Sequence, residues 1–469
     1  MTAYLLPFVV ALIVSGVLTG LVRIVAPKLG LVDVPRQDRW HRRPVPRLGG
    51  IAIYLAFVTA SLFVLHRPLS GERLALLLGG TLIFLVGAID DLVRLENRPK
   101  LLLLILCAVI PALLGVRFEL LPAVIGTPLA ILWILGSTNA FNWLDNMDGV
   151  AAGIAVIASG NLILLSILYG GEEAARLAAI LAGAALGFLI HNFPPARIFM
   201  GDGGSGFLGF TIATIAVIGS YKEVSNVLLI VLVPGLIMSV PIFDTAMVTL
   251  LRALHRRSIL QGGRDHPAHR LVAMGLPERK VVAMLYGLGA LAGSLALATS
   301  FLGFLGGMSL SIVVMLAFVA FGLVLAEVRV YEGPVPRDGH LTPLPRPFWN
   351  MRWIFVMLID VALVSVAYIS AHLLRYEGQL PALVANDVAR TLPLILAAKM
   401  LGFYLAGIYR GAWRYAGVMD VVRLAEGVTV GSLLGVGALF LWTRVEGFSR
   451  AALILDWLLT LLLLTGSRL

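Results

Sequence analysis

The stretch Asn139–Gly149, NAFNWLDNMDG, decides the fold of this chain because it sets acid and amide groups against very apolar neighbours. It holds three asparagines and two aspartates in eleven residues, between LAILWILGS at 129–137 and VAAGIAVIASG at 150–160. A charged side chain at the centre of a membrane-spanning helix costs at least ~2.5–3.5 kcal/mol. A cluster at the end of an apolar segment therefore indicates polar groups that face an aqueous cavity.

The composition is that of a membrane protein. The 469 residues are 59% hydrophobic and 13% charged, with a mean hydropathy of +0.95, whereas soluble domains average about 25% charged residues. The apolar runs have the roughly 20 residues that a spanning helix needs, rather than the roughly 10 of a barrel strand. The sequence therefore predicts an all-α polytopic membrane protein with about fifteen spanning helices. The single cysteine, Cys107, excludes a disulfide within the chain.

A Pro-rich polar run divides the predicted helices into two groups. Residues 332–349, EGPVPRDGHLTPLPRPFW, contain five prolines and are predicted to form a cytoplasmic linker. We expect a membrane domain of about eleven helices at 1–331 and a module of about four helices at 350–469.

Lysine and arginine give the predicted orientation. With the N-terminus outside, the loops that fall inside carry most of these residues, as the positive-inside rule requires. The net charge of +10 is then a topology signal and does not indicate nucleic-acid binding. Six polar stretches fall on the cytoplasmic side: 33–50, 87–100, 139–149, 191–206, 241–252 and 256–271. Because the orientation uses only Lys and Arg, this convergence of Asp, Asn and His is independent support for a single site.

In the opening stretch, four polar side chains recur every three residues. They are Asn139, Asn142, Asp145 and Asp148. On a continuous helix this spacing keeps them along one stripe, which is predicted to face an aqueous cavity. The alternative is a polar cap that ends the helix and hydrogen-bonds a neighbouring element.

Two adjacent carboxylates end another apolar run. Asp90 and Asp91 are like charges so close together that a cation is needed if both are to stay ionised. With Asp145 and Asp202 they would form an oxygen-rich, cysteine-free cluster, which favours Mg²⁺ or Mn²⁺ over zinc. The alternative is a carboxylate pair at a helix C-terminus, solvated by water.

The glycine-rich stretch FMGDGGSGFLGF, 199–210, contains the spacing GxGxxG at Gly201, Gly203 and Gly206. A dinucleotide site is excluded because an apolar helix, and no strand, precedes it. These glycines would let backbone N–H groups approach a phosphate at the start of the next helix. Asp202 would then hold a metal ion that bridges the phosphates. The alternative is a tight re-entry turn.

The stretch GRDHPAHRL, 263–271, supplies His266, His269 and Arg270. We interpret them as cations and hydrogen-bond donors for a pyrophosphate. The alternatives are a metal site and a solvated basic loop.

Other charged residues near the same face have two interpretations. Asp244 either pairs with Arg252 or contacts the substrate. Four residues are interpreted either as ordinary positive-inside charge or as groups that screen phosphate. They are Lys100, His41, Arg42 and Arg43.

In order along residues 1–330, six motifs resemble those of the polyprenyl-phosphate N-acetylhexosamine-1-phosphate transferases, glycosyltransferase family 4. They are DVPRQDRWHRRPVPRLGG, the Asp90–Asp91 pair, NAFNWLDNMDG, NFPPARIFMGDGGSGFLG, PIFDT and DHPAHRL. The resemblance implies transfer of a sugar-1-phosphate from a UDP-N-acetylhexosamine, most simply UDP-GlcNAc, to polyprenyl (undecaprenyl) phosphate. It also implies release of UMP, a need for Mg²⁺, a homodimer, and a site at the cytoplasmic face of a bacterial inner membrane, where cell-surface glycan assembly begins.

The resemblance carries roles for individual residues. The catalytic groups would be Asp90, Asp91 and Asp145, with the metal ion on Asp202 and Asp91. The substrate contacts would be Asn139, Asn142, Asp148, Lys100, His266, His269, Arg270 and Gly201. Such a transfer between two anions needs charge neutralisation and positioning more than covalent chemistry.

Two departures from the family pattern stand out. Asn146 occupies a position where glycine is usual, and asparagine tolerates the left-handed conformation better than most residues. The loop DHPAHRL lacks the three-histidine run of the branch that transfers phospho-MurNAc-pentapeptide, which disfavours a peptidoglycan role.

The C-terminal module has its own resemblance. LLRYEG at 373–378 and GIYRGAWRYAGVMDVVRL at 407–424 resemble the membrane region that precedes the catalytic domain of nucleotide-sugar 4,6-dehydratases and epimerases of polysaccharide biosynthesis. Residues 1–469 hold no NAD-binding unit, so we expect no dehydratase activity here. Three alternatives stay open: the sequence is a piece of a longer chain, a separate dehydratase or epimerase is a partner, or the module is a scaffold. Three ionisable residues lie in apolar spans of this module: Asp360, Lys399 and Asp456. Mutual pairing or snorkelling to the membrane interface is favoured over a lipid or substrate contact.

Two other functions would also bury acids among many helices. A transporter or flippase for lipid-linked sugars would place them near the bilayer midplane. A catalytically inactive scaffold is the second alternative. Acid-rich motifs on one face of the membrane favour the transferase.

Overall fold

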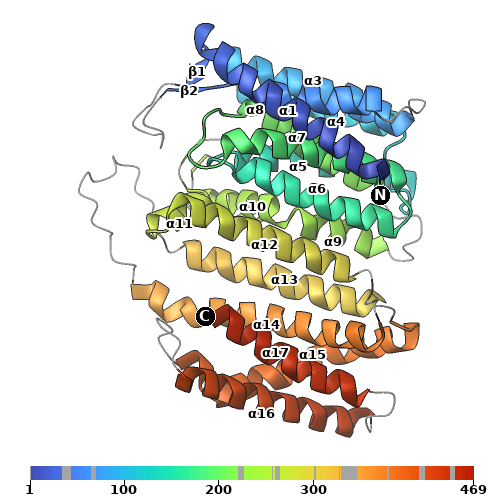
Figure 1. Ribbon diagram of the computed structural model, residues 1–469, viewed down its shortest axis with the longest axis vertical. Helices are drawn as coiled ribbons and strands as arrows, with labels where there is room; N and C mark the ends of the chain where they lie inside the picture. Colours follow the sequence, from blue (N-terminus) through green and yellow to red (C-terminus); the bar gives the residue numbers. More distant parts are fainter. Residues whose placement is uncertain are drawn as a thin grey trace. The chain divides into compact units, whose positions relative to one another are not determined.

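The computed structural model is all-α apart from one very short strand pair (Figure 1). It describes residues 2–33, 44–64, 70–219, 227–255, 257–258, 263, 265–299, 301, 303–326, 328, 346–377, 380–410, 418–443 and 449–468. His41, Arg42, Arg43 and the predicted linker up to Pro345 lie outside these residues. The strands β1 (Val32–Asp33) and β2 (Val45–Pro46) pair antiparallel.

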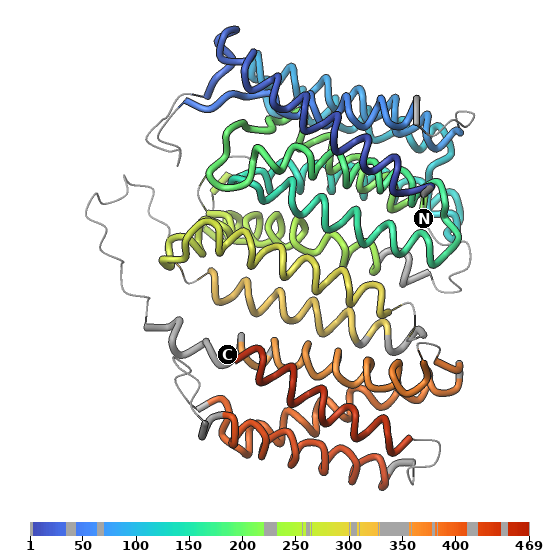
Figure 2. The backbone as a smooth tube through the Cα atoms, viewed as in Figure 1, coloured from blue at the N-terminus to red at the C-terminus, as the bar shows by residue number. Residues whose placement is uncertain are grey.

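Seventeen α-helices are found in the described residues, and Figure 2 follows the chain through them. They are α1 (Thr2–Lys28), α2 (Gly50–Thr59), α3 (Gly71–Val93), α4 (Asn97–Leu113), α5 (Ala123–Leu144), α6 (Val150–Leu168), α7 (Glu172–Asn192), α8 (Gly201–Ile218), α9 (Val227–Ile237), α10 (Ser239–Leu254), α11 (Pro267–Ala273), α12 (Glu278–Thr299), α13 (Gly303–Ala326), α14 (Arg346–Arg375), α15 (Ala382–Leu405), α16 (Val418–Thr443) and α17 (Arg450–Arg468).

Ten helices in the described part of the chain are long and apolar enough to cross a membrane. Gly50–Leu62 and Leu310–Ala326 are shorter apolar helices. The prediction of an all-α polytopic membrane protein is confirmed.

One predicted span is two helices. The sequence predicts a continuous helix over 227–251, but α9 ends at Ile237 and α10 begins at Ser239. Pro241 explains the break, because proline has no N–H to donate to the carbonyl of Ile237 and its ring crowds that carbonyl.

The chain divides into two compact units, which differ from the predicted domains. Unit 1 comprises 1–294 and 328–342, and unit 2 comprises 295–327 and 343–469. Helix α13, predicted as the last helix of the first domain, packs against α14 and α15 in unit 2. Helix α14 already begins at Arg346, inside the predicted linker. The boundaries at 331 and 349 remain predictions.

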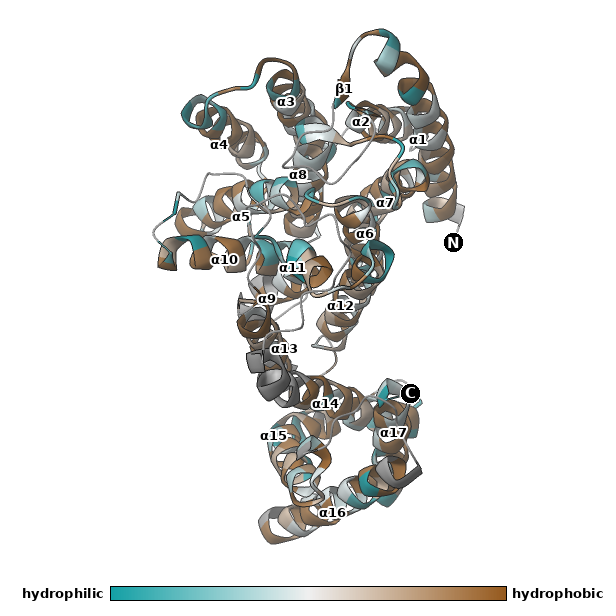
Figure 3. Cartoon of the chain, turned by 90° about the vertical axis from the view of Figure 1, so that its left-hand side faces the viewer, coloured by the Kyte–Doolittle hydropathy of each residue, from teal (hydrophilic) through white to brown (hydrophobic). Residues whose placement is uncertain are grey.

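Unit 1 holds the polar motifs at one end of its helices. Figure 3 looks onto that end, where hydrophilic segments of α5, α8 and α11 face the viewer. Helices α3 and α8 are in very close contact there, since a Cβ on Gly87 would lie 2.5 Å from the Cα of Gly203. This approach brings the C-terminal end of α3 against the N-terminal end of α8.

The three ionisable residues singled out in unit 2 are paired: Lys399 and Asp456 pair with each other, as predicted, whereas Asp360 pairs with Arg468. Lys399 Nζ lies 2.7 Å from Asp456 Oδ2 and donates to Thr460 Oγ1 at 2.6 Å. Asp360 accepts two hydrogen bonds from Arg468 Nη2, each of 2.7 Å. Partnered charges are the form in which ionisable residues are tolerated at membrane depth.

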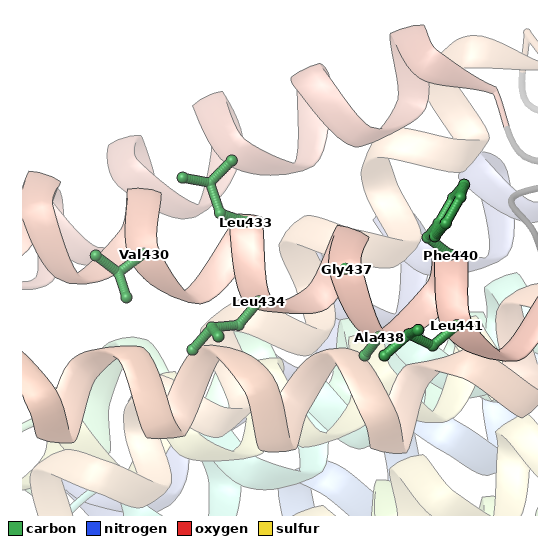
Figure 4. Close-up of a pocket in the computed structure, with 7 residues that line it drawn as sticks. All are labelled: Val430, Leu433, Leu434, Gly437, Ala438, Phe440 and Leu441. Atoms are coloured by element: carbon green, nitrogen blue, oxygen red, sulfur yellow. The ribbon is translucent and has the colours of Figure 1, made fainter.

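An open apolar pocket lies on the surface of α16, and Figure 4 shows that its lining comes from this one helix. The lining residues are Val430, Leu433, Leu434, Gly437, Ala438, Phe440 and Leu441. Its lining offers no side chain for acid–base or phosphate chemistry, whereas unit 1 holds the polar motifs.

Candidate active site

All six polar stretches meet at the same end of unit 1. The stretch 33–50 joins 191–206 through backbone hydrogen bonds, including Gly49 N–H to Phe199 O at 2.9 Å. The stretches 87–100 and 139–149 also join 191–206 through side-chain hydrogen bonds, and 241–252 and 256–271 contact 139–149 through Trp143. The convergence that the sequence predicts is therefore present in three dimensions.

The carboxylate of Asp91 caps the N-terminal end of α8. Asp91 Oδ1 accepts the N–H of Asp202 at 3.1 Å, and Oδ2 accepts the N–H of Gly203 at 3.3 Å. A negative group is stabilised at this end of a helix by the unpaired N–H groups and the helix dipole. These two N–H groups, expected from the sequence to approach a phosphate, thus already bind Asp91.

Gly201 is required by this arrangement. Its φ is +79°, a left-handed conformation, and a Cβ there would lie 2.5 Å from Asp91 Oδ2. Any larger residue would be strained and would push Asp91 away from the helix terminus.

Lys100 bridges two carboxylates from different helices. Its Nζ lies 2.7 Å from Asp90 Oδ2 and 2.5 Å from Asp202 Oδ2. Asp90 also accepts the N–H of Leu95 at 2.6 Å, which fixes the turn after α3. The Asp202 side chain is 35% exposed and that of Asp90 only 14%, so Asp202 is the carboxylate of this pair that a ligand can reach.

Asp145 lies at the C-terminal end of α5 and faces the same carboxylates. Burial, followed by the negative charges of Asp202 and Asp91, raises the pKa of Asp145 to about 8. Within the described residues, no protein group donates a hydrogen bond to its side chain. Asp90, Asp91, Asp145 and Asp202 are called the acidic cluster from here on.

The predicted polar stripe is only half correct. Helix α5 ends at Leu144, and Asp145 is its C-cap residue, so Asp148 does not continue the helical spacing. Asn142 does reach across, donating to Ser205 Oγ at 3.1 Å. Asn139 donates to Leu135 O in its own helix at 2.9 Å.

Residues 145–149 form a turn that is held from several sides. Asp148 Oδ2 accepts the N–H of Ala196 at 2.7 Å, and Asn192 Oδ1 accepts the N–H of Gly149 at 2.9 Å. Asp148 therefore acts here as the polar cap that the sequence left as an alternative. Asn146 has no positive φ and donates to Trp143 O at 2.8 Å, so this position does not use the left-handed conformation that asparagine tolerates.

The histidine loop packs against the same turn through Trp143. The guanidinium of Arg252 lies 5.6 Å from the centre of the Trp143 ring, and the His266 ring meets it edge-on at 6.5 Å. His266 Nδ1 lies 2.8 Å from Asp244 Oδ2. Of the two interpretations of Asp244, pairing with Arg252 is not found, because the loop supplies His266 as the partner of Asp244 and Asp265 as the partner of Arg252.

Arg252 pairs with Asp265, which belongs to the histidine loop. Arg252 donates to Asp265 Oδ2 at 2.8 Å through Nε and to Oδ1 at 2.7 Å through Nη2. Burial would raise the pKa of Asp265, but the hydrogen bonds and charge of Arg252 outweigh it and hold this pKa below its ordinary value. The two-pronged geometry locks the loop onto α10.

The three residues predicted to contact the pyrophosphate are buried rather than exposed to solvent. They are His266, His269 and Arg270. Arg270 donates to the carbonyl oxygens of Asp265 and Val328, each at 2.7 Å. These residues thus lie at the same end of the helices as the acidic cluster. The two hydrogen bonds of Arg270 hold the loop in place. Arg264 lies outside the described residues.

The acidic cluster offers the type of ligand atom that a hard divalent cation prefers. Its ligand atoms are all carboxylate oxygens, and one lysine faces several acids. In the part of the chain that the structure describes, no three acidic, histidine or cysteine side chains form a ready-made metal cage. Mg²⁺ needs none, because it binds through one or two carboxylates, waters and substrate phosphates.

Sequence reasoning missed two residues of this site. Ser205 connects Asn142 to the carbonyl of Gly201, at 3.1 and 3.2 Å. Asn192 joins Gly149 to Ile198, to which it donates at 2.9 Å. Both lie inside stretches singled out for other residues, so only their position within those motifs could have drawn attention to them.

Comparison with known proteins identifies relatives of this site. Residues 73–220 match glycosyl transferase family 4. The chain is 34% identical over 292 residues to a probable undecaprenyl-phosphate N-acetylglucosaminyl 1-phosphate transferase of Bacillus subtilis (strain 168), covering 60% of this chain and 81% of that protein. It is 31% identical over 312 residues to a decaprenyl-phosphate N-acetylglucosaminephosphotransferase of Mycolicibacterium smegmatis, covering 59% and 77%.

A more distant relative is also similar. The chain is 30% identical over 241 residues to a phospho-N-acetylmuramoyl-pentapeptide-transferase of Halalkalibacterium halodurans, covering 46% of this chain and 74% of that protein. The acidic cluster lies within the residues that match the family. Because the identity also extends over most of the length of the first two relatives, this chain belongs to glycosyl transferase family 4.

Proposed function

We propose that this protein transfers N-acetylglucosamine-1-phosphate from UDP-N-acetylglucosamine to a polyprenyl phosphate such as undecaprenyl phosphate, with release of UMP. The observation that carries the proposal is the acidic cluster around Lys100 at one end of the helices. The named activities of the relatives point to the same substrates. A transporter would hold such acids near the bilayer midplane instead.

Charge neutralisation is the main requirement of the reaction, because a phosphate attacks a diphosphate. Asp202, with Asp91 or Asp145 beside it, would hold Mg²⁺ or Mn²⁺, which supplies positive charge to the diphosphate when bound. Lys100 Nζ, between Asp90 and Asp202, places a further cation at the same point. Fixed charges that need no reorganisation are the most effective form of such stabilisation.

Asp145 is the carboxylate best placed to accept a proton from the lipid phosphate. Without a cation its pKa of about 8 leaves it mostly protonated near neutral pH; a bound divalent cation would offset the charges of Asp202 and Asp91 and leave the carboxylate free to accept a proton. Asp90 and Asp91 instead accept hydrogen bonds from the backbone, Asp90 from Leu95 and Asp91 from the start of α8. We therefore assign proton transfer to Asp145 and orientation of the metal and helix to Asp91.

We further propose the setting in which this reaction takes place. The active end of unit 1 faces the cytoplasm of a bacterial cell and the N-terminus lies outside, as the distribution of Lys and Arg supports. The reaction then starts assembly of a cell-surface glycan. A homodimer, and a separate dehydratase or epimerase docking on residues 350–469, follow from the sequence resemblances alone.

The test is UMP release by the purified full chain in detergent, with undecaprenyl phosphate, Mg²⁺ and UDP-N-acetylglucosamine, followed by other UDP-sugars. Asp202→Asn and an EDTA arm run beside it, with the exposed carboxylate variant Glu377→Gln as the matched control. We expect UMP only when lipid, metal and Asp202 are all present. Folded protein that releases no UMP from any donor would contradict the proposal.

A further inference from the structure

A tyrosine from α12 holds the turn that carries Asp145. The hydroxyl of Tyr286 donates to the carbonyl oxygen of Gly149 at 2.6 Å, across 137 positions of sequence. Helix α12 lies beyond the residues that match the family, and none of the polar stretches includes it. This contact comes from a segment whose sequence, an apolar helix, predicts only membrane insertion.

Gly149 is tied at both of its backbone groups. Its N–H is donated to Asn192 Oδ1 at 2.9 Å, and its carbonyl accepts from Tyr286. Its φ of +76° is left-handed, so the chain reverses here between the turn and α6. The C-terminal end of the turn 145–149 is thereby fixed from α7 and α12 together.

The neighbouring helix is shaped to admit this tyrosine. A Cβ on Gly153 would lie 2.0 Å from the Tyr286 hydroxyl and 2.3 Å from a ring carbon. Only glycine leaves room for the ring at this place on α6. A second α12 contact, Arg279 Nε to Pro194 O at 2.9 Å, holds the segment that leads to Asp202.

The backbone of the turn positions Asp145, because in the part of the chain that the structure describes the Asp145 side chain accepts no hydrogen bond that would fix it; only the Asp145 N–H is bonded, to Phe141 O at 3.2 Å. Within the described residues no protein group donates to its carboxylate. Its distance from Asp91 and Asp202 therefore depends on the backbone of residues 145–149. A displacement of about 1 Å of a reacting group can cost about 100-fold in rate.

We propose that Tyr286 is a positioning residue for the transfer reaction: its hydroxyl, seated over Gly153, sets the turn that carries Asp145 against Asp91 and Asp202. This inference rests on the proposed function for its effect on rate, but not for the geometry of the turn. It predicts that losing the hydroxyl lowers turnover without weakening substrate binding.

The experiment compares Tyr286→Phe with Tyr54→Phe. Tyr54 is a matched control, since its hydroxyl lies 2.9 Å from Thr81 Oγ1 elsewhere in unit 1. For Tyr286→Phe we expect kcat to fall about tenfold, the effect of one hydrogen bond, with KM for the UDP-sugar and for the lipid within about twofold. Melting temperatures of the two variants should agree within about 4 °C.

Hydrogen exchange gives a readout that does not need catalysis. The amides of residues 145–149 should exchange faster in Tyr286→Phe than in the parent protein and in Tyr54→Phe. Gly153→Ala, which displaces the ring, should reproduce the loss of kcat. Gly160→Ala, a position on the same helix with nothing within 4 Å of its Cβ, should not.

Equal kcat values for the two tyrosine variants, or unchanged exchange at 145–149, would overturn the inference. A parent protein that releases no UMP from any donor would instead overturn the proposed function. The exchange comparison would then still decide whether Tyr286 holds this turn.

Discussion

Lys100 Nζ lies 2.5 Å from Oδ2 of Asp202, although the two residues are 102 positions apart. The same ammonium group contacts Asp90 at 2.7 Å. One cation thus joins the start of α4 to the C-terminal end of α3 and to the N-terminal end of α8. The acidic cluster would otherwise hold carboxylates of like charge at close range, which is unfavourable.

Replacing Lys100 by Gln should remove nearly all transfer activity. The change leaves Asp90 and Asp202 without their shared cation and removes a fixed positive charge from the diphosphate, a loss of about 100-fold or more in kcat. Steady-state UMP release measures it. The exposed variant Lys28→Gln serves as control, and a Lys100→Gln enzyme with normal kcat would show that the bridge is only structural.

Gly201→Ala should abolish activity while the protein still inserts in the membrane. An alanine at this position must adopt a left-handed φ of +79°, and its Cβ would lie 2.5 Å from Asp91 Oδ2. The resulting strain costs about 1–3 kcal/mol. The measurements are UMP release and elution as a single species in detergent. Gly160→Ala, with open space around its Cβ, should behave as the parent. Normal turnover in Gly201→Ala would mean that Asp91 is free to move.

Asp145→Asn should stabilise the metal-free protein, and more so at higher pH. The folded-state pKa is raised from the ordinary 3.8 to about 8, so the folded chain keeps a proton that the unfolded chain releases. Stability conferred by the aspartate therefore falls as pH rises from about 4 to about 8. Melting temperatures in EDTA at pH 5 and pH 8.5 test this.

The gain from Asp145→Asn should shrink when Mg²⁺ is added, because the cation offsets the charge of the aspartate. The same variant should be inactive in UMP release. A gain that is equal at both pH values would contradict the raised pKa.

Asp265→Asn should destabilise the protein near neutral pH and make little difference in acid. The pKa of Asp265 is lowered in the folded state, so its ion pair with Arg252 stabilises the fold above the unfolded pKa of about 3.9. That contribution is lost as pH falls through the lower, folded-state pKa. Thermal melts of parent and variant between pH 7 and pH 3 should converge in acid. A constant difference between the two curves would exclude this origin.

Replacing only Lys399 should lower the stability of the protein more than replacing both Lys399 and Asp456. Lys399→Met leaves a buried carboxylate unpaired, an expected loss of about 3–5 kcal/mol. The double variant with Asp456→Leu should recover most of this, because well-packed apolar residues often replace a buried pair without loss. Apparent melting temperatures of the single and double variants in detergent form the cycle. Additive losses would show that the two charges do not interact.

The sequence alone determined that the chain is an all-α polytopic membrane protein and which polar stretches gather at one end of its helices. Long apolar runs predict spanning helices, since no backbone group can be left unpaired in the bilayer. Counts of Lys and Arg in the loops predict the orientation. Asp90, Asp91, Asp145 and Asp202 were therefore recognisable as one cluster before any contact was known.

The tertiary structure decided which partner each polar group of the site meets. Asp91 proves to cap α8, α5 stops at Leu144, and Asp265, rather than Asp244, pairs with Arg252. The support from Tyr286 had no signal in the sequence at all. These assignments depend on distances of 2.6 to 3.1 Å between groups on different helices. Hydropathy and spacing specify which end of a helix is polar, but only packing selects the partner that each donor meets.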